Sequence, residues 1–461
     1  MKESTKKNDI LKKIQSQEKP SKLKESEKEI AKPKKRFPPV LLLFMSLIFI
    51  PFFNLFSYFP ALPNIHEYFA TSWSIVMLTT SLYQIVVGFS PLIIGPSSDL
   101  FGRRNLVIVC SFFYAILSLT CFFAKSIKLF LIARTAQGFF TVGQISIFYT
   151  SIYEILPLEK VGIGLSALSF SITFAILISP TIGGIIVNRY EWRGLFAVYT
   201  LLGCYSFFSS LLFYKETVQK KKTQLRKLVK SWVDPLRYYF KKDLILIFLI
   251  DGIFYGLYNF QIVMIPLIIN KYYHYNETII GLSLMPSGFG GLIGAIFCGP
   301  LIDYFYKKYN NVGSRMIIGF ISLVGFGIAF FFFGYTLLKS FIGILVCGFF
   351  LNLFITTEIN STISAIFDLY PTKTSSVYAI TLLTQSAFSM ITSQISVFAV
   401  ESPFKWFLIG SIFQLFIISP TWFMILKKNW TIKRVDQKHQ DEMEFLNLTN
   451  IDEGITKDNC K

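Results

Sequence analysis

Long apolar segments recur along the whole chain and decide what it can fold into. Hydrophobic residues make up 53% of its 461 residues, and the mean hydropathy is +0.52. A soluble domain cannot bury that much apolar surface, so lipid is the expected solvent. Because a backbone in lipid must satisfy its own hydrogen bonds, apolar segments of about 20 residues form helices. The sequence therefore predicts an all-α membrane protein.

The positions of these apolar segments predict twelve transmembrane helices. The predicted helices begin near Val40, Trp73, Asn105, Ile127, Ile163, Leu195, Leu244, Ile279, Met316, Phe341, Ser376 and Phe404.

Two short motifs occur twice, each time where an apolar segment ends. Residues 95–99 (GPSSD) match residues 299–303 (GPLID), and residues 153–157 (YEILP) match residues 367–371 (FDLYP). Repetition in the same order is typical of a duplicated membrane unit whose copies are related by an axis along the membrane normal. The chain is therefore expected to form two pseudo-symmetric six-helix halves.

The repeat and the charge distribution together predict the domain organisation. Most of the 45 Lys and Arg residues fall in segments that are cytoplasmic if both termini are inside. We expect a disordered basic cytoplasmic tail over 1–38, six-helix halves over 39–214 and 243–426, a cytoplasmic linker over 215–242 and a cytoplasmic tail over 427–461. The net charge of +18 then reflects topology and attraction to anionic lipid rather than nucleic-acid binding.

Several kinds of site are not expected from the sequence. The six cysteines and three histidines are scattered, without metal-ligand spacing or a disulfide framework. The sequence also has no nucleotide-binding glycine loop, and no nucleophile, base and orienting group fall together. We therefore expect no metal, no cofactor and no enzyme activity.

One predicted inner loop carries the first motif with recognisable chemistry. It combines two glycines, an acid and two arginines, namely Gly95, Asp99, Gly102, Arg103 and Arg104. The glycines let helices approach and turn, and the acid can accept hydrogen bonds from a helix N-terminus and an arginine. The second copy keeps Asp303 but has Lys307 and Lys308 further on in place of the arginine pair.

This loop resembles the signature of major facilitator transporters, in which it locks the inner gate. Residues 58–63 (YFPALP), 83–84 (YQ), 215–217 (KET) and 284–288 (LMPSG) also resemble the fungal twelve-span drug:proton antiporter family. The resemblance covers residues 40–426 and implies alternating access around a midplane cavity. Simple anchoring by positive charge is the alternative role for the arginines, although it needs neither the glycines nor the acid.

Arg134 lies inside an apolar segment and is followed by Gln137 and Gly138. A guanidinium buried in a membrane is costly unless partners compensate, so such residues usually face a functional cavity. The segment resembles the family's fourth-helix signature, which implies proton coupling or substrate orientation. The alternative is an arginine whose side chain reaches the outer headgroups.

The fifth predicted helix ends in a run of small residues that resembles the family's antiporter signature. The motif residues are Ser179, Pro180, Gly183 and Gly184. Small residues permit close helix packing, and ordinary packing is the alternative role. Ala175 and Ser179 stand where the family pattern has glycine, which weakens the inference of antiport.

Proton coupling needs a titratable group, and the first predicted helix has no acid. Asp251 and Glu358 lie at similar depth on the seventh and tenth predicted helices. The resemblance implies that both helices line the cavity, where the two carboxylates could share protons. The alternatives are packing acids with hydrogen-bond partners, or contact with water at the inner surface. Thr381 and Gln385 stand where family members have an asparagine and an arginine.

Six polar or aromatic residues are candidates for lining the cavity, namely Asn54, Tyr58, Gln144, Tyr255, Tyr258 and Asn352. An aromatic and acidic stripe suits organic cations through cation–π contacts. Aromatic faces also serve packing, which is the more common use in a chain with 50 Phe and 23 Tyr.

These features predict a proton-coupled antiporter that exports amphipathic organic compounds such as drugs, organic cations or polyamines. The first alternative is a symporter or facilitator that imports a small nutrient or polyamine, and the second is a membrane sensor that does not transport. We expect a monomer in the lipid bilayer with a small-molecule substrate, no nucleic-acid partner, and a proton gradient rather than a cofactor as the driving force. The plasma membrane is favoured over the vacuolar membrane.

Overall fold

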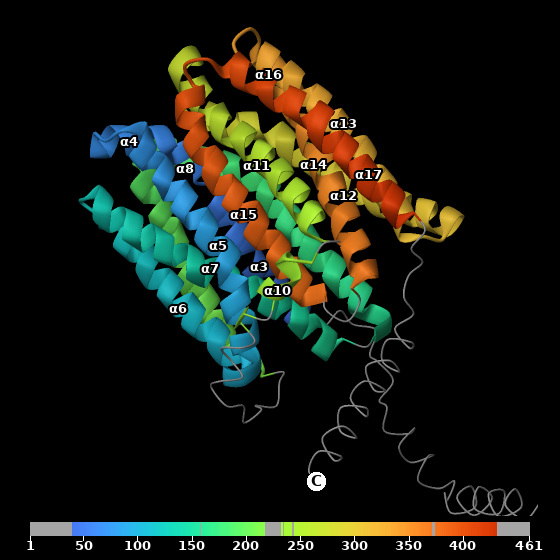
Figure 1. The fold of residues 1–461 in the computed structure, drawn as a ribbon. Coiled ribbons are helices and arrows are strands. Elements are labelled where there is room, and N and C mark those ends of the chain that lie inside the picture. The colour runs from blue at the N-terminus through green and yellow to red at the C-terminus, as the bar shows by residue number, and fades with distance from the viewer. Residues whose placement is uncertain are drawn as a thin grey trace, which may run out of the picture. The chain divides into compact units, whose positions relative to one another are not determined.

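The computed structural model describes residues 39–156, 158–216, 232–233, 235–241, 244–370 and 374–430. The predicted tail over 1–38, most of the predicted linker and the chain beyond residue 430 lie outside the described residues. Within the described residues every regular element is a helix, as Figure 1 shows. The described residues from Leu42 onward belong to one compact unit.

Long helices dominate the first part of the chain. They are α3 (Pro39–Phe56), α5 (Trp73–Phe101), α6 (Arg103–Phe122), α7 (Ile127–Ile155) and α8 (Leu158–Phe213), with the short η1 (Phe59–Ala61) and α4 (Leu62–Phe69) after α3. Glu191 in α8 has φ 57° and ψ −176°, which an α-helix cannot contain, so α8 consists of two helical segments that meet there. The predicted starts near Ile163 and Leu195 fall in these two segments.

The second part of the chain is also built from long helices. They are α11 (Ile245–Ile268), α12 (Glu277–Tyr309), α13 (Val312–Thr336), α14 (Phe341–Leu369), α15 (Thr374–Ala399), α16 (Pro403–Phe413) and α17 (Ser419–Asn429), with the shorter α10 (Leu236–Tyr239), η2 (Ile269–Tyr273) and η4 (Gln414–Ile418). The π-helical η4 joins α16 and α17 into one segment. Side chains of Asn276, Asn311 and Ser340 accept hydrogen bonds from backbone N–H groups three residues on, so local sequence sets the starts of α12, α13 and α14.

Nine helical segments of the described residues are long and apolar enough to cross a membrane. This count takes α8 once and leaves out α7 and α15, although these have 29 and 26 residues. The prediction of an all-α membrane protein is confirmed, and a helical segment begins within a few residues of each predicted start. The number of twelve spans and the division into two halves stay predictions.

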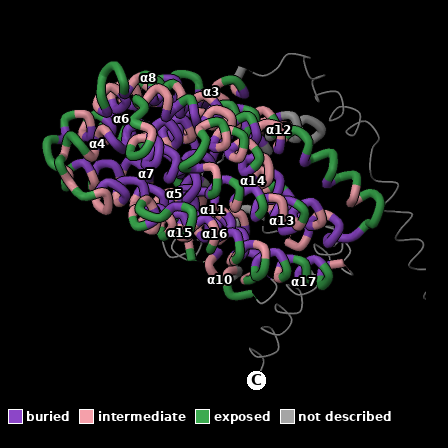
Figure 2. The backbone as a smooth tube through the Cα atoms, turned by 90° about the horizontal axis from the view of Figure 1, so that it is seen from above, coloured by how far each residue is buried: buried purple, intermediate pink, exposed green. Residues whose placement is uncertain are grey.

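Many polar residues are buried inside this helical unit, and many large apolar residues are exposed on its outside. Among helices distant in sequence, α5 packs on α15, α8 on α12 and α12 on α14, and Figure 1 shows α5 and α15 side by side. Figure 2 shows buried segments in the interior and exposed ones along the periphery. Leu212 and Ile342 are 70% and 71% exposed, whereas Arg134 is 1% exposed. Such a distribution is expected when the surrounding solvent is lipid.

Candidate functional site

Arg134 on α7 is enclosed by aromatic rings and amide oxygens. Its Nη1 donates to Asn54 Oδ1 at 2.7 Å and to Gln137 Oε1 at 2.5 Å. Its guanidinium carbon lies 4.3 Å from the centre of the Tyr58 ring and 4.2 Å from that of Tyr83. The side chain therefore does not reach the headgroups. Ring faces and amide dipoles stabilise its charge, and no carboxylate contacts it among the described residues.

A second layer of hydrogen bonds holds these partners in place. Asn54 Nδ2 donates to the Tyr114 hydroxyl at 3.0 Å, and Gln137 Nε2 donates to Ser118 Oγ at 2.6 Å. Asn54 and Tyr58, predicted as cavity residues, thus belong to the arginine cluster. The cluster ties α3, α5, α6 and α7 together through one buried cation.

Asp251 on α11 and Glu358 on α14 are both fully buried. Gln385 Nε2 donates to Asp251 Oδ2 at 2.9 Å, and Thr362 Oγ1 donates to Glu358 Oε1 at 2.6 Å. The second oxygen of each carboxyl group has no hydrogen-bond partner within the described residues, and neither group has a cationic partner there. Glutamine at 385, where the resemblance leads one to expect arginine, supplies a neutral donor instead of a positive charge.

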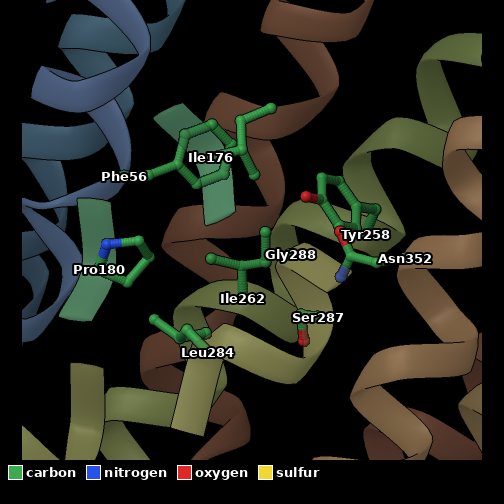
Figure 3. Close-up of a pocket in the computed structure, with 9 residues that line it drawn as sticks. All are labelled: Phe56, Ile176, Pro180, Tyr258, Ile262, Leu284, Ser287, Gly288 and Asn352. Atoms are coloured by element: carbon green, nitrogen blue, oxygen red, sulfur yellow. The ribbon is translucent and has the colours of Figure 1, made fainter. Parts of the chain in front are cut away.

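A small cavity lies between α3, α8, α11, α12 and α14. Its lining residues are Phe56, Ile176, Pro180, Tyr258, Ile262, Leu284, Ser287, Gly288 and Asn352. Figure 3 shows the apolar side chains of Phe56, Ile176 and Pro180 on one side and the polar ends of Tyr258, Asn352 and Ser287 on the other.

Two of the six predicted cavity residues, Tyr258 and Asn352, line this cavity. Tyr255 packs edge-on against Tyr258, with ring centres 5.6 Å apart. Gln144 donates to Phe140 O on its own helix and is not a lining residue. Of the six predicted residues, Tyr258 and Asn352 therefore line the cavity. Asn54 and Tyr58 contact Arg134 instead.

The small-residue motif on α8 lies where this helix touches α3 and α12. A Cβ at Gly183 would lie 2.3 Å from Ser57 O, and one at Gly184 would lie 2.3 Å from Glu277 O. Ser179 Oγ donates to Ala175 O within α8. Because α12 belongs to the other predicted half, the motif packs across the predicted halves and not only within one of them.

Two polar contacts also join α5 to helices of the second predicted half. Gln84 Nε2 donates to Asn259 Oδ1 at 2.7 Å, and Gln394 Nε2 donates to Ser81 Oγ at 3.0 Å. Neither Asn259 nor Gln394 was predicted as a site residue. In the sequence, the only feature that marks these two residues is an amide side chain inside an apolar segment. Many residues with a purely packing role have the same feature.

The loop that joins α5 and α6, the first of the two repeated loops, forms an ion pair and backbone contacts. Arg103 Nη2 lies 2.8 Å from Glu154 Oε1, and Arg104 Nη2 donates to Leu211 O at 2.7 Å. Gly102 adopts φ 91°, which favours glycine at the junction of α5 and α6. The side chain of Asp99 lies outside the described residues. Gly95 faces Ser146 on α7, where a Cβ would make ordinary contact at 3.5 Å.

The second copy of this loop uses an arginine that the sequence analysis missed. Arg315, at the start of α13, lies with Nη1 3.4 Å from Asp303 Oδ1 and with Nε hydrogen-bonded to Asp368 Oδ2. Glu154 and Asp368 are equivalent positions of the repeated motif, so both copies place an arginine on that acid. Arg315 lies 212 residues after Arg103, between the offsets of 204 and 214 residues that relate the two repeated motifs, so an exact repeat spacing does not point to it.

The sequence matches one family over most of its length. The sequence model of the Major Facilitator Superfamily matches residues 44–393. "Probable efflux pump mfs2" of Aspergillus flavus is 26% identical over 287 residues, which cover 56% of this chain and 68% of that protein. "Probable transporter AQR1" of Saccharomyces cerevisiae is 23% identical over 380 residues, which cover 69% of this chain and 64% of that protein.

Solved structures of other transporters share the fold at low identity. An inward-facing, unoccupied bacterial homolog of the human lysosomal transporter Spinster has a TM-score of 0.66 at 12% identity, covering 88% of this chain and 100% of that one. A POT family transporter in complex with 5-aminolevulinic acid has a TM-score of 0.67 at 15% identity, covering 87% and 99%. With the family match over most of the sequence, the chain belongs to the major facilitator superfamily and is a multi-pass membrane transporter rather than an enzyme.

Proposed function

We propose that the protein is a proton-coupled antiporter that exports amphipathic organic compounds, with Asp251 and Glu358 as its proton-binding pair. The observation that carries this proposal is the complete burial of both carboxyl groups without a cationic partner in the described part of the chain. Burying an unpaired carboxylate is costly, and binding a proton removes that cost. In this proposal the two carboxyl groups bind and release protons as a unit.

The proposed cycle alternates access to the cavity from the two sides of the membrane. When the cavity opens outward, a proton binds the pair while the substrate leaves. When the cavity opens inward, the proton is released and a new substrate binds. In this scheme Arg134 is a positioning residue, because its guanidinium carbon lies within 4.3 Å of the ring centres of Tyr58 and Tyr83 and its Nη1 is hydrogen-bonded to two amide oxygens.

Two observations support export over import. The Aspergillus flavus relative is named a probable efflux pump. The small-residue motif on α8 resembles the family's antiporter signature and packs against α12. We propose the plasma membrane as the location, with both termini in the cytoplasm.

The proposal is tested with purified protein in liposomes that contain a pH-sensitive dye. A panel of lipophilic cations, polyamines and neutral amides is added under an imposed pH gradient. The wild type should move at least one compound and protons in opposite directions. Glu358→Gln and Asp251→Asn should lose the response to the gradient, because neither variant can exchange a proton at that position.

Glu401→Gln is the matched control, since Glu401 is an exposed acid in an ion pair with Lys271. Its transport should equal that of the wild type. Gradient-driven accumulation that survives in both Glu358→Gln and Asp251→Asn would refute the assignment of the proton pair. Movement of protons in the same direction as the compound would instead establish a symporter.

A further inference from the structure

Buried hydrogen-bonding groups without partners lie on the polar side of the cavity and directly beside it. Both amide atoms of Gln261 and the hydroxyl of Ser287 have no hydrogen-bond partner within the described residues. Gln261 is fully buried and Ser287 is 4% exposed. Buried polar groups in proteins are nearly always paired, so an unpaired set at one place calls for an explanation.

These groups lie close to one another, around a position that has no side chain. A Cβ at Gly348 would lie 2.7 Å from Ser287 Oγ and 3.8 Å from Gln261 Nε2. Asn352, one turn further along α14, donates only a 3.4 Å hydrogen bond to Gly348 O and is 3% exposed. Its Oδ1 accepts no hydrogen bond in the part of the chain that the structure describes. Together these residues present both donors and acceptors to one region.

The cavity carries no charge that would balance a charged ligand. None of its lining residues is Asp, Glu, Lys or Arg. Asn352 and Glu358 are six residues apart on α14, which places the acid about 9 Å further along the helix. An ammonium or carboxylate group in the cavity would therefore lose its hydration without gaining a counter-charge.

From this arrangement we propose that the cavity recognises substrates by an uncharged amide or lactam group, bound by Ser287 and Asn352 of its lining and by Gln261 beside them. An amide offers one N–H donor and one carbonyl acceptor, which the glutamine side chain can match with its own acceptor and donor. The apolar part of the substrate then packs against Phe56, Ile176 and Leu284. This inference rests on the proposed transport function and names the chemical class of its substrate.

The test measures binding of three compounds with the same apolar part to the full chain in lipid nanodiscs. The compounds are cinnamamide, the cinnamylammonium ion and the hydrocarbon β-methylstyrene, and the method is isothermal titration calorimetry. Cinnamamide should bind at least tenfold more tightly than the other two. Gln261→Leu and Ser287→Ala should each remove most of this preference.

Ser283→Ala is the matched control, because Ser283 lies one turn away on α12 and its hydroxyl is already bonded to Ile280 O at 2.7 Å. It should keep the preference for the amide. In the absence of ligand, Gln261→Leu should raise the melting temperature, since it removes an unpaired buried amide. This second measurement also shows whether the variant folds, and Ser287→Ala provides the binding test if it does not.

Tighter binding of the ammonium ion, binding of none of the three, or an amide preference that persists in both variants would overturn the inference. Proton movement in liposomes separates this outcome from a failure of the proposed function. If transport is proton-coupled but shows no amide preference, only the inference fails. If the amide binds through Gln261 and no proton moves, only the coupling proposal fails.

Discussion

A methyl group at Gly281 is expected to push α8 and α12 apart. Its Cβ would lie 2.3 Å from Pro180 O and 3.0 Å from Pro180 C, which are backbone atoms that cannot rotate away. Overpacking of this kind costs about 1–3 kcal/mol. That cost falls on the conformation in which the two helices touch. Gly281→Ala should therefore shift the equilibrium away from this conformation by about 5- to 150-fold.

Distance measurements between spin labels can detect this shift in nanodiscs. Suitable label sites in a cysteine-free background are Tyr190 in α8 and Leu338 between α13 and α14, which are 67% and 45% exposed. Both lie at the predicted outer side, in different predicted halves. Gly281→Ala should increase the population with longer distances.

Gly299→Ala is the control for this experiment. Gly299 lies on the same helix, and a Cβ there would meet no atom within 4 Å. Both substitutions raise the helix propensity of α12 equally, so only the contact with α8 differs. Distance distributions that are the same for Gly281→Ala, Gly299→Ala and the wild type would refute the packing argument.

Three further variants test other contacts. Gln385→Arg places a cation beside Asp251, and a nearby positive charge favours the ionised carboxylate. Proton-coupled transport in liposomes should therefore fall at least tenfold. Unchanged transport would show that the contact between residues 385 and 251 has no part in proton coupling. Arg315→Ala removes the cation shared by Asp303 and Asp368 and should lower the free energy of unfolding by about 1–3 kcal/mol in thermal unfolding. Lys307→Ala, the control, should change this free energy by less than about 0.5 kcal/mol. Equal effects of the two substitutions would contradict the ion-pair assignment. Glu401→Gln removes an exposed ion pair and should cost less than about 1 kcal/mol, so a larger loss of melting temperature would contradict its surface role.

Sequence reasoning identified the residue types that carry the site more readily than their partners. Arg134, Asp251 and Glu358 were found because charged groups are rare and costly inside apolar segments. Gln385, the partner of Asp251, was noticed in the sequence only because family members have an arginine at this position. Gln261, although fully buried, gave no signal, since one amide in an apolar segment does not reveal whether it is paired.

The sequence by itself determined the membrane class, the positions of the helices and the repeated loop motifs. These properties are local, because an apolar segment of sufficient length satisfies its backbone within itself. Caps such as Asn276 and Ser340 act over three residues and are equally readable.

Only the tertiary structure decided which side chains meet. Arg134 and Asn54 are 80 residues apart, Asp251 and Gln385 are 134 apart, and Gln394 and Ser81 are 313 apart. Helical periodicity places a residue on a face of its own helix but contains no information about the facing helix. Packing between helices therefore determined the arginine cluster, the contact between Asp251 and Gln385, and the cavity.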